Sequence, residues 1–304
     1  MKHTLKITLL LVLIFFTTQV IGLAVTNKYI AIKEHIDPET KLAVKEIIPQ
    51  DLPYNIERPE VQQSTSYIWI VAAIIIGTLL LLLLIKYKKF NLWKIWFFIA
   101  VFATMAIAFS AFIPSAIAAL LAFILALLKI FRPTTVIQNL TEIFIYGGLA
   151  AIFVPIINIF AAFMLLLIIS IYDFIAVNKT KHMITLAKFQ TKSRVFAGFM
   201  LPYEKREDKI ITKPAKAGQK GIRIAVLGGG DVGFPLLFAG VVMKGLMLTN
   251  IEIIGFLKTL IIPFFVTLAL LYLLLKGKQD KFYPAMPYLT AGCIIGYLVI
   301  LLVF

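Results

Sequence analysis

The sequence predicts an all-α protein that crosses a membrane several times. Of its 304 residues, 61% are apolar and only 15% are charged, and the mean hydropathy is strongly positive. Soluble domains contain about 45–50% apolar and about 25% charged residues, so the composition excludes a soluble globular protein. The apolar residues form continuous runs of about the length of a membrane-spanning helix, without the alternation of a membrane β-barrel. Such runs must be helical, because a lipid-facing backbone has to satisfy its own hydrogen bonds.

Nine apolar runs are candidate spans, of which the fourth is short. Pro114 and Pro155 mark tight turns between neighbouring runs, so spans three to six should form antiparallel hairpins. The basic residues ahead of the first run also fit a signal peptide, and the sequence leaves open whether residues 1–25 are retained. The predicted spans are residues 7–25, 66–85, 95–113, 115–130, 137–154, 156–177, 222–246, 253–275 and 283–304.

The lysine and arginine residues predict the orientation of these spans. With the N-terminus inside, 23 of the 30 basic residues fall in inside segments and seven fall outside. Because cytoplasmic loops carry the excess of basic residues, we expect the N-terminus and the 178–221 loop in the cytoplasm and the C-terminus outside. The net charge of +15 then reflects topology, which argues against nucleic acid as a partner. One membrane domain is expected: 1–177 with the outer loop 26–65, the basic loop 178–221, and 222–304.

Asp173 and Asp231 are the two acidic residues that fall well inside apolar runs. The other thirteen lie in loops or, like Glu142 and Glu252, near span ends that water can reach. At about 1.5 Å rise per residue, the two aspartates lie roughly 9 Å and 12 Å below the same cytoplasmic surface. Ionisable residues inside a membrane are usually functional. Two carboxyl groups at one depth on adjacent antiparallel spans could therefore face each other.

Paired carboxyl groups in a membrane indicate a specific chemistry. Two close carboxylates cannot both ionise cheaply, so they share a proton. One then acts as a base on water and the other as an acid toward a carbonyl group, as in aspartic proteases. The structural alternative is that each aspartate caps a helix or bonds a neighbouring backbone. No metal or organic cofactor is implied, and three scattered histidines and one cysteine offer no metal site.

Three local sequences surround these acids. Tyr172 precedes Asp173, and Gly228, Gly229 and Gly230 precede Asp231. Glycines let the backbone unwind and let another chain approach, so the seventh span should be loosened there. The third sequence, Pro284-Ala285-Met286-Pro287, lies at the inner end of the last span. Its prolines leave backbone groups without helical partners, and such a segment could line a site or accept an extended peptide.

Together these motifs resemble the presenilin and signal peptide peptidase family of nine-span intramembrane aspartyl proteases, which share a Gly-x-Gly-Asp motif. The resemblance covers the order of all nine spans and implies a presenilin-like fold. It implies that Asp173 and Asp231 are the catalytic pair. It also implies that Pro284, Ala285 and Met286 occupy the family's Pro-Ala-Leu position and shape the site. Met286 departs from leucine, but methionine is apolar and similar in volume.

The resemblance also implies the partners. The substrate is a single transmembrane helix of another protein in the lipid bilayer, and the presenilin-like orientation predicts that its N-terminus lies outside. The small size suggests a microbial, archaeal homologue that works without accessory subunits. The sequence indicates neither the oligomeric state, nor the cleavage position, nor whether the 178–221 loop is self-cleaved.

Three alternatives remain open at this stage. Residues 222–227 followed by Gly228-x-Gly230-x-x-Gly233 match a dinucleotide-binding fingerprint, although too little polar chain surrounds it for several βαβ units. Prepilin peptidases share the Gly-x-Gly-Asp motif with a different arrangement of spans. A channel or transporter could also use paired intramembrane acids. Partial survival of function in Asp231→Asn would indicate a channel, since a protease should lose all turnover.

Overall fold

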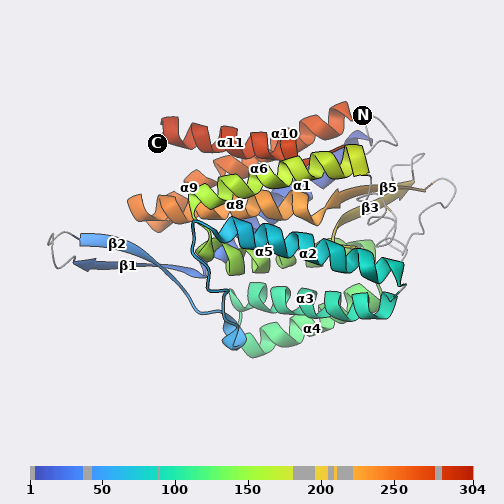
Figure 1. The fold of residues 1–304 in the computed structure, drawn as a ribbon, viewed down its shortest axis with the longest axis horizontal. Coiled ribbons are helices and arrows are strands. Elements are labelled where there is room, and N and C mark those ends of the chain that lie inside the picture. The colour runs from blue at the N-terminus through green and yellow to red at the C-terminus, as the bar shows by residue number, and fades with distance from the viewer. Residues whose placement is uncertain are drawn as a thin grey trace.

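The protein is a bundle of helices with a small sheet near each end (Figure 1). A computed structural model describes residues 4–36, 43–87, 89–180, 196–204, 209–210, 222–277 and 283–303. The helices are α1 (Leu5–Asn27), α2 (Ser66–Lys86), α3 (Phe90–Ser110), α4 (Ser115–Phe131), α5 (Thr135–Phe153), α6 (Ile159–Ile175), α8 (Gly229–Thr249), α9 (Glu252–Thr259), α10 (Ile261–Lys276) and α11 (Met286–Val303). Three short helical turns complete them: η1 (Pro53–Asn55), η2 (Val154–Ile156) and the π-helical turn η3 (Ala176–Thr180).

Each of the nine predicted spans corresponds to a helix of the bundle. Eight spans among the described residues are long and apolar enough to cross a membrane, and one of them combines α9 and α10, which meet at Leu260. The fourth, α4, has 17 residues and is about 26 Å long, slightly shorter than a hydrocarbon core of about 30 Å. The two termini lie at opposite ends of the bundle (Figure 1), as an odd number of spans requires.

The prediction that the seventh span begins as a helix at residue 222 is wrong. Residues Ile222–Gly228 form strand β5, and α8 begins only at Gly229. Alternating β-branched residues, Ile222, Ile224 and Val226, favour an extended chain. An apolar run by itself does not distinguish a buried strand from a helix. The glycines therefore mark a strand-to-helix junction and do not loosen the interior of a helix.

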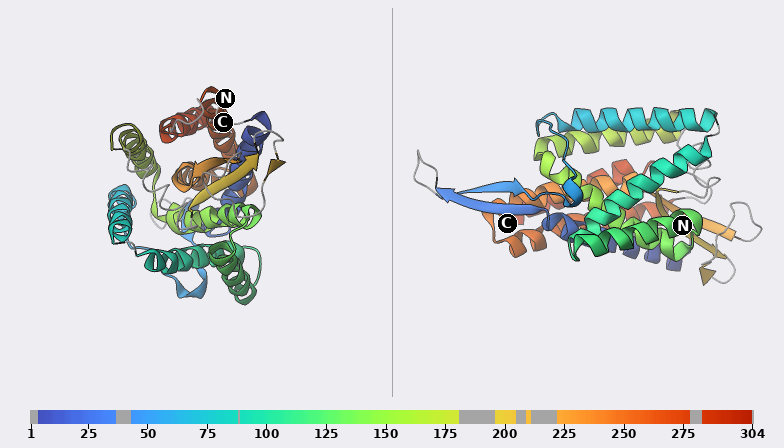
Figure 2. Two further views of the ribbon diagram at one scale, coloured as in Figure 1. Left: turned by 90° about the vertical axis from the view of Figure 1, so that its right-hand side faces the viewer. Right: turned by 90° about the horizontal axis from the view of Figure 1, so that it is seen from below.

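Two antiparallel sheets lie outside the helices. Strands β1 (Ile30–Ile36) and β2 (Ala43–Pro49) form a hairpin that projects beyond one end of the bundle (Figure 2). At the other end, β3 (Gly198–Glu204) pairs with β5 and with the short β4 (Lys209–Ile210), in the order β4-β3-β5. The β3–β5 register pairs Gly198 with Gly228 and so ends at the start of α8.

Helix α8 occupies the centre of the bundle and contacts α1, α5, α6, α10 and α11. Small residues allow the closest approaches, as is usual between membrane helices. A methyl group at Gly292 would lie 2.8 Å from Cα of Val266, and one at Gly296 would lie 2.8 Å from Cα of Ile262. These contacts join α11 to α10. By contrast, α2 lies at the edge of the bundle (Figure 2), and Ser66 and Leu81 are the only buried residues among those described in it.

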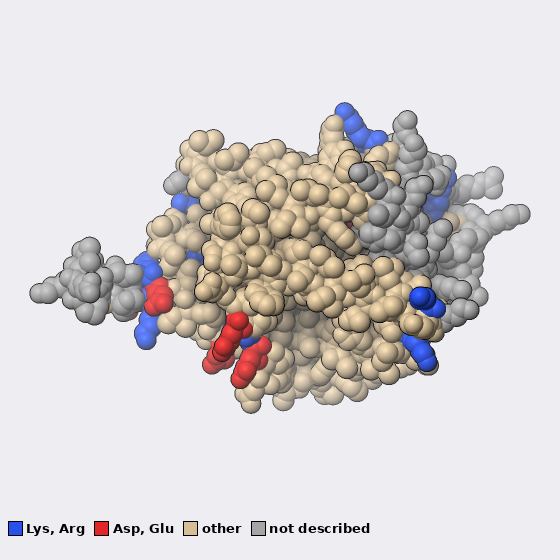
Figure 3. Space-filling view, viewed as in Figure 1, with Lys and Arg blue, Asp and Glu red and all other residues tan. Residues whose placement is uncertain are grey.

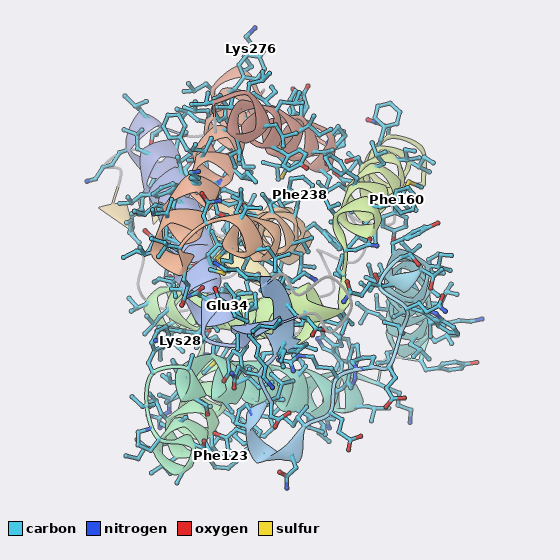
Figure 4. All side chains as sticks on the ribbon, turned by 90° about the vertical axis from the view of Figure 1, so that its left-hand side faces the viewer. Lys28, Glu34, Phe123, Phe160, Phe238 and Lys276 are labelled. Atoms are coloured by element: carbon cyan, nitrogen blue, oxygen red, sulfur yellow. The ribbon has the colours of Figure 1, made fainter. Side chains whose placement is uncertain are left out.

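The surface has the charge distribution of a membrane protein. In Figure 3 the lysine, arginine and acidic residues gather toward the two ends, and a wide belt without charged residues lies between them. Large apolar side chains such as Leu79 and Leu120 are exposed on the helices. Inside the bundle, Phe238 of α8, labelled in Figure 4, packs edge-to-face on Phe163 of α6 and Tyr297 of α11, with ring centroids 4.9 Å and 6.0 Å away.

The segment between α1 and α2 is fastened to the bundle by Tyr29 and Arg58. The Tyr29 hydroxyl donates to the carbonyl of Ile107, at 2.6 Å. Burial, with a smaller contribution from Tyr54, raises the pKa of Tyr29 to about 12, so this donor keeps its proton at neutral pH. The Arg58 guanidinium donates to the carbonyl of Gln50 at 2.7 Å and to that of Ala151. These contacts join the segment after α1 to α3 and α5.

Candidate active site

Asp231 lies in the first turn of α8, directly after the β5 strand. The positive end of the helix dipole stabilises a negative charge at this position. Pro235, four residues later, has no N–H to donate to the Asp231 carbonyl, so the first turn is held by fewer helical bonds than usual. The strand-to-helix junction therefore places a carboxyl group where the backbone changes direction.

Asp173 lies near the end of α6 and is buried, with 5% of its surface exposed. Its carboxylate accepts a hydrogen bond from the backbone N–H of Met286, at 3.1 Å, and also interacts with the backbone N–H of Ala285. The Asp173 side chain thus caps the start of α11, as the structural alternative supposed. The same contact brings it against the Pro284–Met286 segment.

The two aspartates lie at the same end of the bundle on helices that contact each other. Helix α6 ends and α8 begins on the right of Figure 1, where α11 also starts. The buried hydroxyls of Ser170 and Thr290, 2.7 Å apart, join α6 to α11 one turn from Asp173. Water and a peptide that reached this end of the bundle would meet carboxyl groups from two helices.

The other predicted site residues lie around these two. Tyr172 is partly exposed on α6, Pro284 is partly exposed, and Ala285 is buried. Met286 is also buried, but it meets Asp173 through its backbone. A backbone N–H makes this hydrogen bond, so the bond does not require a particular side chain at position 286.

The three glycines differ in how tightly they are confined. A methyl group at Gly228 would lie 3.3 Å from a carboxylate oxygen of Asp231, and one at Gly230 would lie 3.3 Å from the Phe234 ring. At Gly229 it would lie 2.8 Å from the Tyr146 hydroxyl. The most confined of the three is thus the one that the Gly-x-Gly-Asp motif leaves variable.

The prediction that Glu142 lies near a span end within reach of water is wrong. Its side chain is 1% exposed and forms an ion pair of 2.7 Å with Lys129, which is equally buried. Glu142 is the eighth residue of α5, where it accepts hydrogen bonds from Lys129 of α4 and from Gln138 and Tyr146 of its own helix. Sequence reasoning also missed Lys129 and Tyr146. The four-residue spacing of Gln138, Glu142 and Tyr146 in an apolar run was the signal that could have revealed a polar helix face.

Gly198, at the start of β3, is a further residue that the sequence did not single out. Its φ of +142° lies in the region that side chains rarely adopt, and a methyl group there would overlap the carbonyl oxygen of Leu227. We expect Gly198→Ala to strain the β3–β5 junction and to lower turnover at the two aspartates at least about tenfold, because small displacements of a site have large effects on rate. Turnover of a purified single-span substrate measures this. The matched variant Gly245→Ala, where a methyl group meets nothing within 4 Å, should keep full turnover.

The structure also bears on a nucleotide or metal site. The dinucleotide fingerprint forms a strand followed by a helix, but β5 lies in a three-stranded antiparallel sheet, whereas that fold needs parallel βαβ units. Over the ranges that the structure describes, no group of three or more histidine, cysteine or acidic side chains could hold a metal ion.

A family model and two solved structures that resemble this chain all belong to one family. The family described as signal-peptide peptidase, presenilin aspartyl protease matches residues 41–304. Two solved structures, both of a presenilin family intramembrane aspartate protease in different crystal forms, have a similar fold. One has a TM-score of 0.61 at 17% identity, covering 98% of this chain and 99% of the other. The second has a TM-score of 0.56 at 18% identity, covering 97% of each chain. A comparison with curated proteins finds no match.

The family match includes both aspartates and the Pro284–Met286 segment and covers most of the chain. It supports neither a channel nor a prepilin peptidase, the two other interpretations of paired intramembrane acids. The helical fold agrees with it. The chain therefore belongs to the signal-peptide peptidase and presenilin family, and it is an intramembrane aspartyl protease.

Proposed function

We propose that Asp173 and Asp231 are the catalytic pair of this protease and that they cleave transmembrane helices of other proteins. The observation that carries the proposal is their placement at one end of an apolar bundle, on the contacting helices α6 and α8. Asp173 is also hydrogen-bonded to the Pro284–Met286 segment through Met286. Buried carboxyl groups in a membrane are costly and are seldom retained without a function.

The chemistry requires one ionised and one protonated carboxyl group. The ionised aspartate removes a proton from water as the water oxygen attacks the substrate carbonyl carbon, and the protonated aspartate donates its proton to the carbonyl oxygen. The resulting diol collapses as the amide nitrogen takes a proton and the C–N bond breaks. The products are a new carboxyl end and a new amino end. No group other than water and the two aspartates takes part.

We propose that the substrate binds as an extended strand beside β5. Within the described part of the chain, β5 has a neighbour, β3, along one side only. It leads directly into Gly228, Gly229 and Gly230 and then to Asp231. An added strand would satisfy its backbone hydrogen bonds against such an edge, as in other cases of strand addition. This arrangement would also unwind the substrate helix, whose carbonyl groups are otherwise hidden by helical hydrogen bonds.

The orientation of the substrate follows from the proposed topology. We place the N-terminus and the 178–221 loop in the cytoplasm and the C-terminus outside, because most basic residues then lie inside. Most of that loop, and with it the question of self-cleavage, lies outside the described residues. The substrate would be a single-span protein with its N-terminus outside, and accessory subunits would not be needed. We place the protein in the cell membrane.

A reconstitution experiment tests the substrate class. The purified chain in liposomes is given two substrates with the same membrane span, one inserted with its N-terminus outside and the other inverted. Mass spectrometry of the products should locate a cut inside the span of the first substrate and at least about tenfold less product from the second. Equal cleavage of both would contradict the orientation. Cuts confined to residues outside the span would contradict intramembrane cleavage.

A further inference from the structure

A polar face of α5 lies against the proposed catalytic site. Gln138, Asn139, Glu142 and Tyr146 are spaced so that they share one side of the helix, and each is less than 9% exposed. Buried polar side chains are rare in membrane helices and require partners. These four find their partners in α4, in the start of β3 and next to the Gly228–Asp231 junction.

Glu142 is fixed by a buried ion pair. Lys129 of α4 donates to one Glu142 oxygen at 2.7 Å, and also to the side-chain oxygens of Gln138 and Thr141, both at 3.1 Å. The Tyr146 hydroxyl donates to the second oxygen of Glu142 in a short hydrogen bond. Lys129 therefore holds Glu142, and Glu142 holds the hydroxyl of Tyr146.

Tyr146 in turn packs beneath the junction that carries Asp231. A methyl group added to Gly229 would lie only 2.8 Å from the hydroxyl oxygen of Tyr146, so the two residues are in close contact. Asp231 lies close enough for its charge to interact with Tyr146. The Gly229 backbone N–H donates to the carbonyl of Ala197 at 3.2 Å, which joins the junction to the residue before β3.

Gln138 and Asn139 hold the chain that runs into β3. The Gln138 amide donates to the carbonyls of Phe196 and Gly198, at 2.9 Å and 2.8 Å. The Asn139 side chain donates to the carbonyl of Met200 at 3.0 Å and accepts from its N–H at 2.9 Å, much as a neighbouring strand would. Side chains of α5 thus pair with β3 along the edge opposite β5.

We infer that Glu142 and Tyr146, anchored by Lys129, are positioning residues that hold the Gly228–Gly230 junction and thereby orient Asp231 for catalysis. The inference rests on the proposed role of Asp231. The network contains groups from α4, α5, the start of β3 and the start of α8, so a change in α4 would alter the site through three intervening contacts. Another buried lysine, Lys244, serves a different purpose, because it donates to the carbonyls of Val154, Pro155 and Ile157 at the opposite end of α5.

Tyr146→Phe tests the inference because it removes only the hydroxyl and keeps the ring that packs on Phe199. We expect kcat to fall about tenfold to a hundredfold with KM unchanged, as for a displaced catalytic group. Hydrogen exchange at the Gly229 backbone amide, measured on peptides spanning residues 225–234, should become faster. Tyr29→Phe is the matched control, since it also removes a buried tyrosine hydrogen bond, but at the outer end of the bundle. Tyr29→Phe should keep the native kcat and the native rate of hydrogen exchange at the Gly229 amide.

Two double variants test whether Glu142 and Tyr146 position Asp231 or only support the fold. Lys129→Met with Glu142→Leu removes both charges together, which folded proteins often tolerate, but leaves Tyr146 without its acceptor. Lys129→Met with Glu142→Gln also removes both charges but keeps an acceptor oxygen. We expect the first to fold and to show the low kcat and fast exchange of Tyr146→Phe. The second should regain most of the native kcat.

The possible results are distinguishable. Native kcat and native exchange in Tyr146→Phe, or native kcat in the Lys129→Met, Glu142→Leu variant, would overturn the inference. Equal loss of kcat in both double variants would also overturn it, because the acceptor would then be irrelevant. If the native chain cleaves no substrate, the proposed function fails, and the exchange of the Gly229 amide alone decides whether Tyr146 and Glu142 hold the junction.

Discussion

Replacing either Asp173 or Asp231 with asparagine should abolish intramembrane cleavage while leaving the bundle folded. Asparagine has nearly the volume of aspartate, so packing is kept, but it can neither take the proton from water nor donate one to the carbonyl. Acid–base catalysis by one positioned group contributes about 10²–10⁴-fold, so each variant should lose at least about a hundredfold in turnover. Initial rates on a purified single-span substrate measure this loss.

The control for these variants changes an acid to an amide elsewhere. Glu252 is exposed at the start of α9, where it accepts a hydrogen bond from Asn27. Glu252→Gln should retain native turnover. Turnover above a tenth of the native rate in either aspartate variant would contradict the two-aspartate mechanism. Thermal unfolding followed by circular dichroism verifies that lost turnover is not lost fold.

Gly148→Val should destabilise the bundle more than any other glycine substitution in a span. A methyl group at Gly148 of α5 would overlap the backbone carbonyl of Thr104 in α3, and neither helix backbone can move aside locally. Overpacking of a well-packed core costs about 1–3 kcal/mol, and a backbone clash belongs at or above the upper end of that range. We expect the unfolding temperature in detergent to fall and the yield of folded protein with it.

Gly77→Val is the matched control for this prediction. Gly77 lies within α2, where a methyl group meets nothing within 4 Å. Both substitutions place a β-branched residue in an apolar helix. The difference between their unfolding temperatures therefore reports on the packing of α5 on α3. A Gly148→Val protein as stable as Gly77→Val would show that the two helices do not approach as closely as described.

The span order could be predicted, and the two aspartates could be singled out, because each depends on local sequence. A run of about 20 apolar residues is a helix wherever it crosses a lipid core, and an acid inside such a run is conspicuous. The Pro284–Met286 segment could be singled out for a similar reason, since prolines interrupt helical hydrogen bonding. Its contact with Asp173 needed the fold, because α6 and α11 are more than a hundred residues apart.

The sheet beside the start of α8 could not be predicted from the apolar pattern. The apolar pattern predicts residues 222–228 as the start of the seventh span, because a short apolar strand and the first turns of a helix have the same composition. Lys129 is one of the 23 basic residues in the segments predicted to lie inside, although its side chain is buried against Glu142. Whether a charged residue at a span end points to water or inward depends on a partner from another helix, and no local pattern reveals that partner.

The account depends most on Asp173 and Asp231 forming one site, and disulfide cross-linking tests this directly. Cys293 is the protein's single cysteine, and Cys293→Ala gives a clean background for cysteines at positions 173 and 231. A disulfide requires Cα atoms about 4.4–6.8 Å apart, and flexible bifunctional thiol reagents extend the range. After proteolysis within residues 181–221, we expect the two halves of the 173–231 variant to stay joined on a denaturing gel, and reduction to release them where the link is a disulfide. The control is the pair Phe174→Cys with Asp231→Cys, because Phe174 is 52% exposed on the surface of α6. Its two halves should separate after proteolysis. Separation of the 173–231 pair under every reagent would contradict a shared active site.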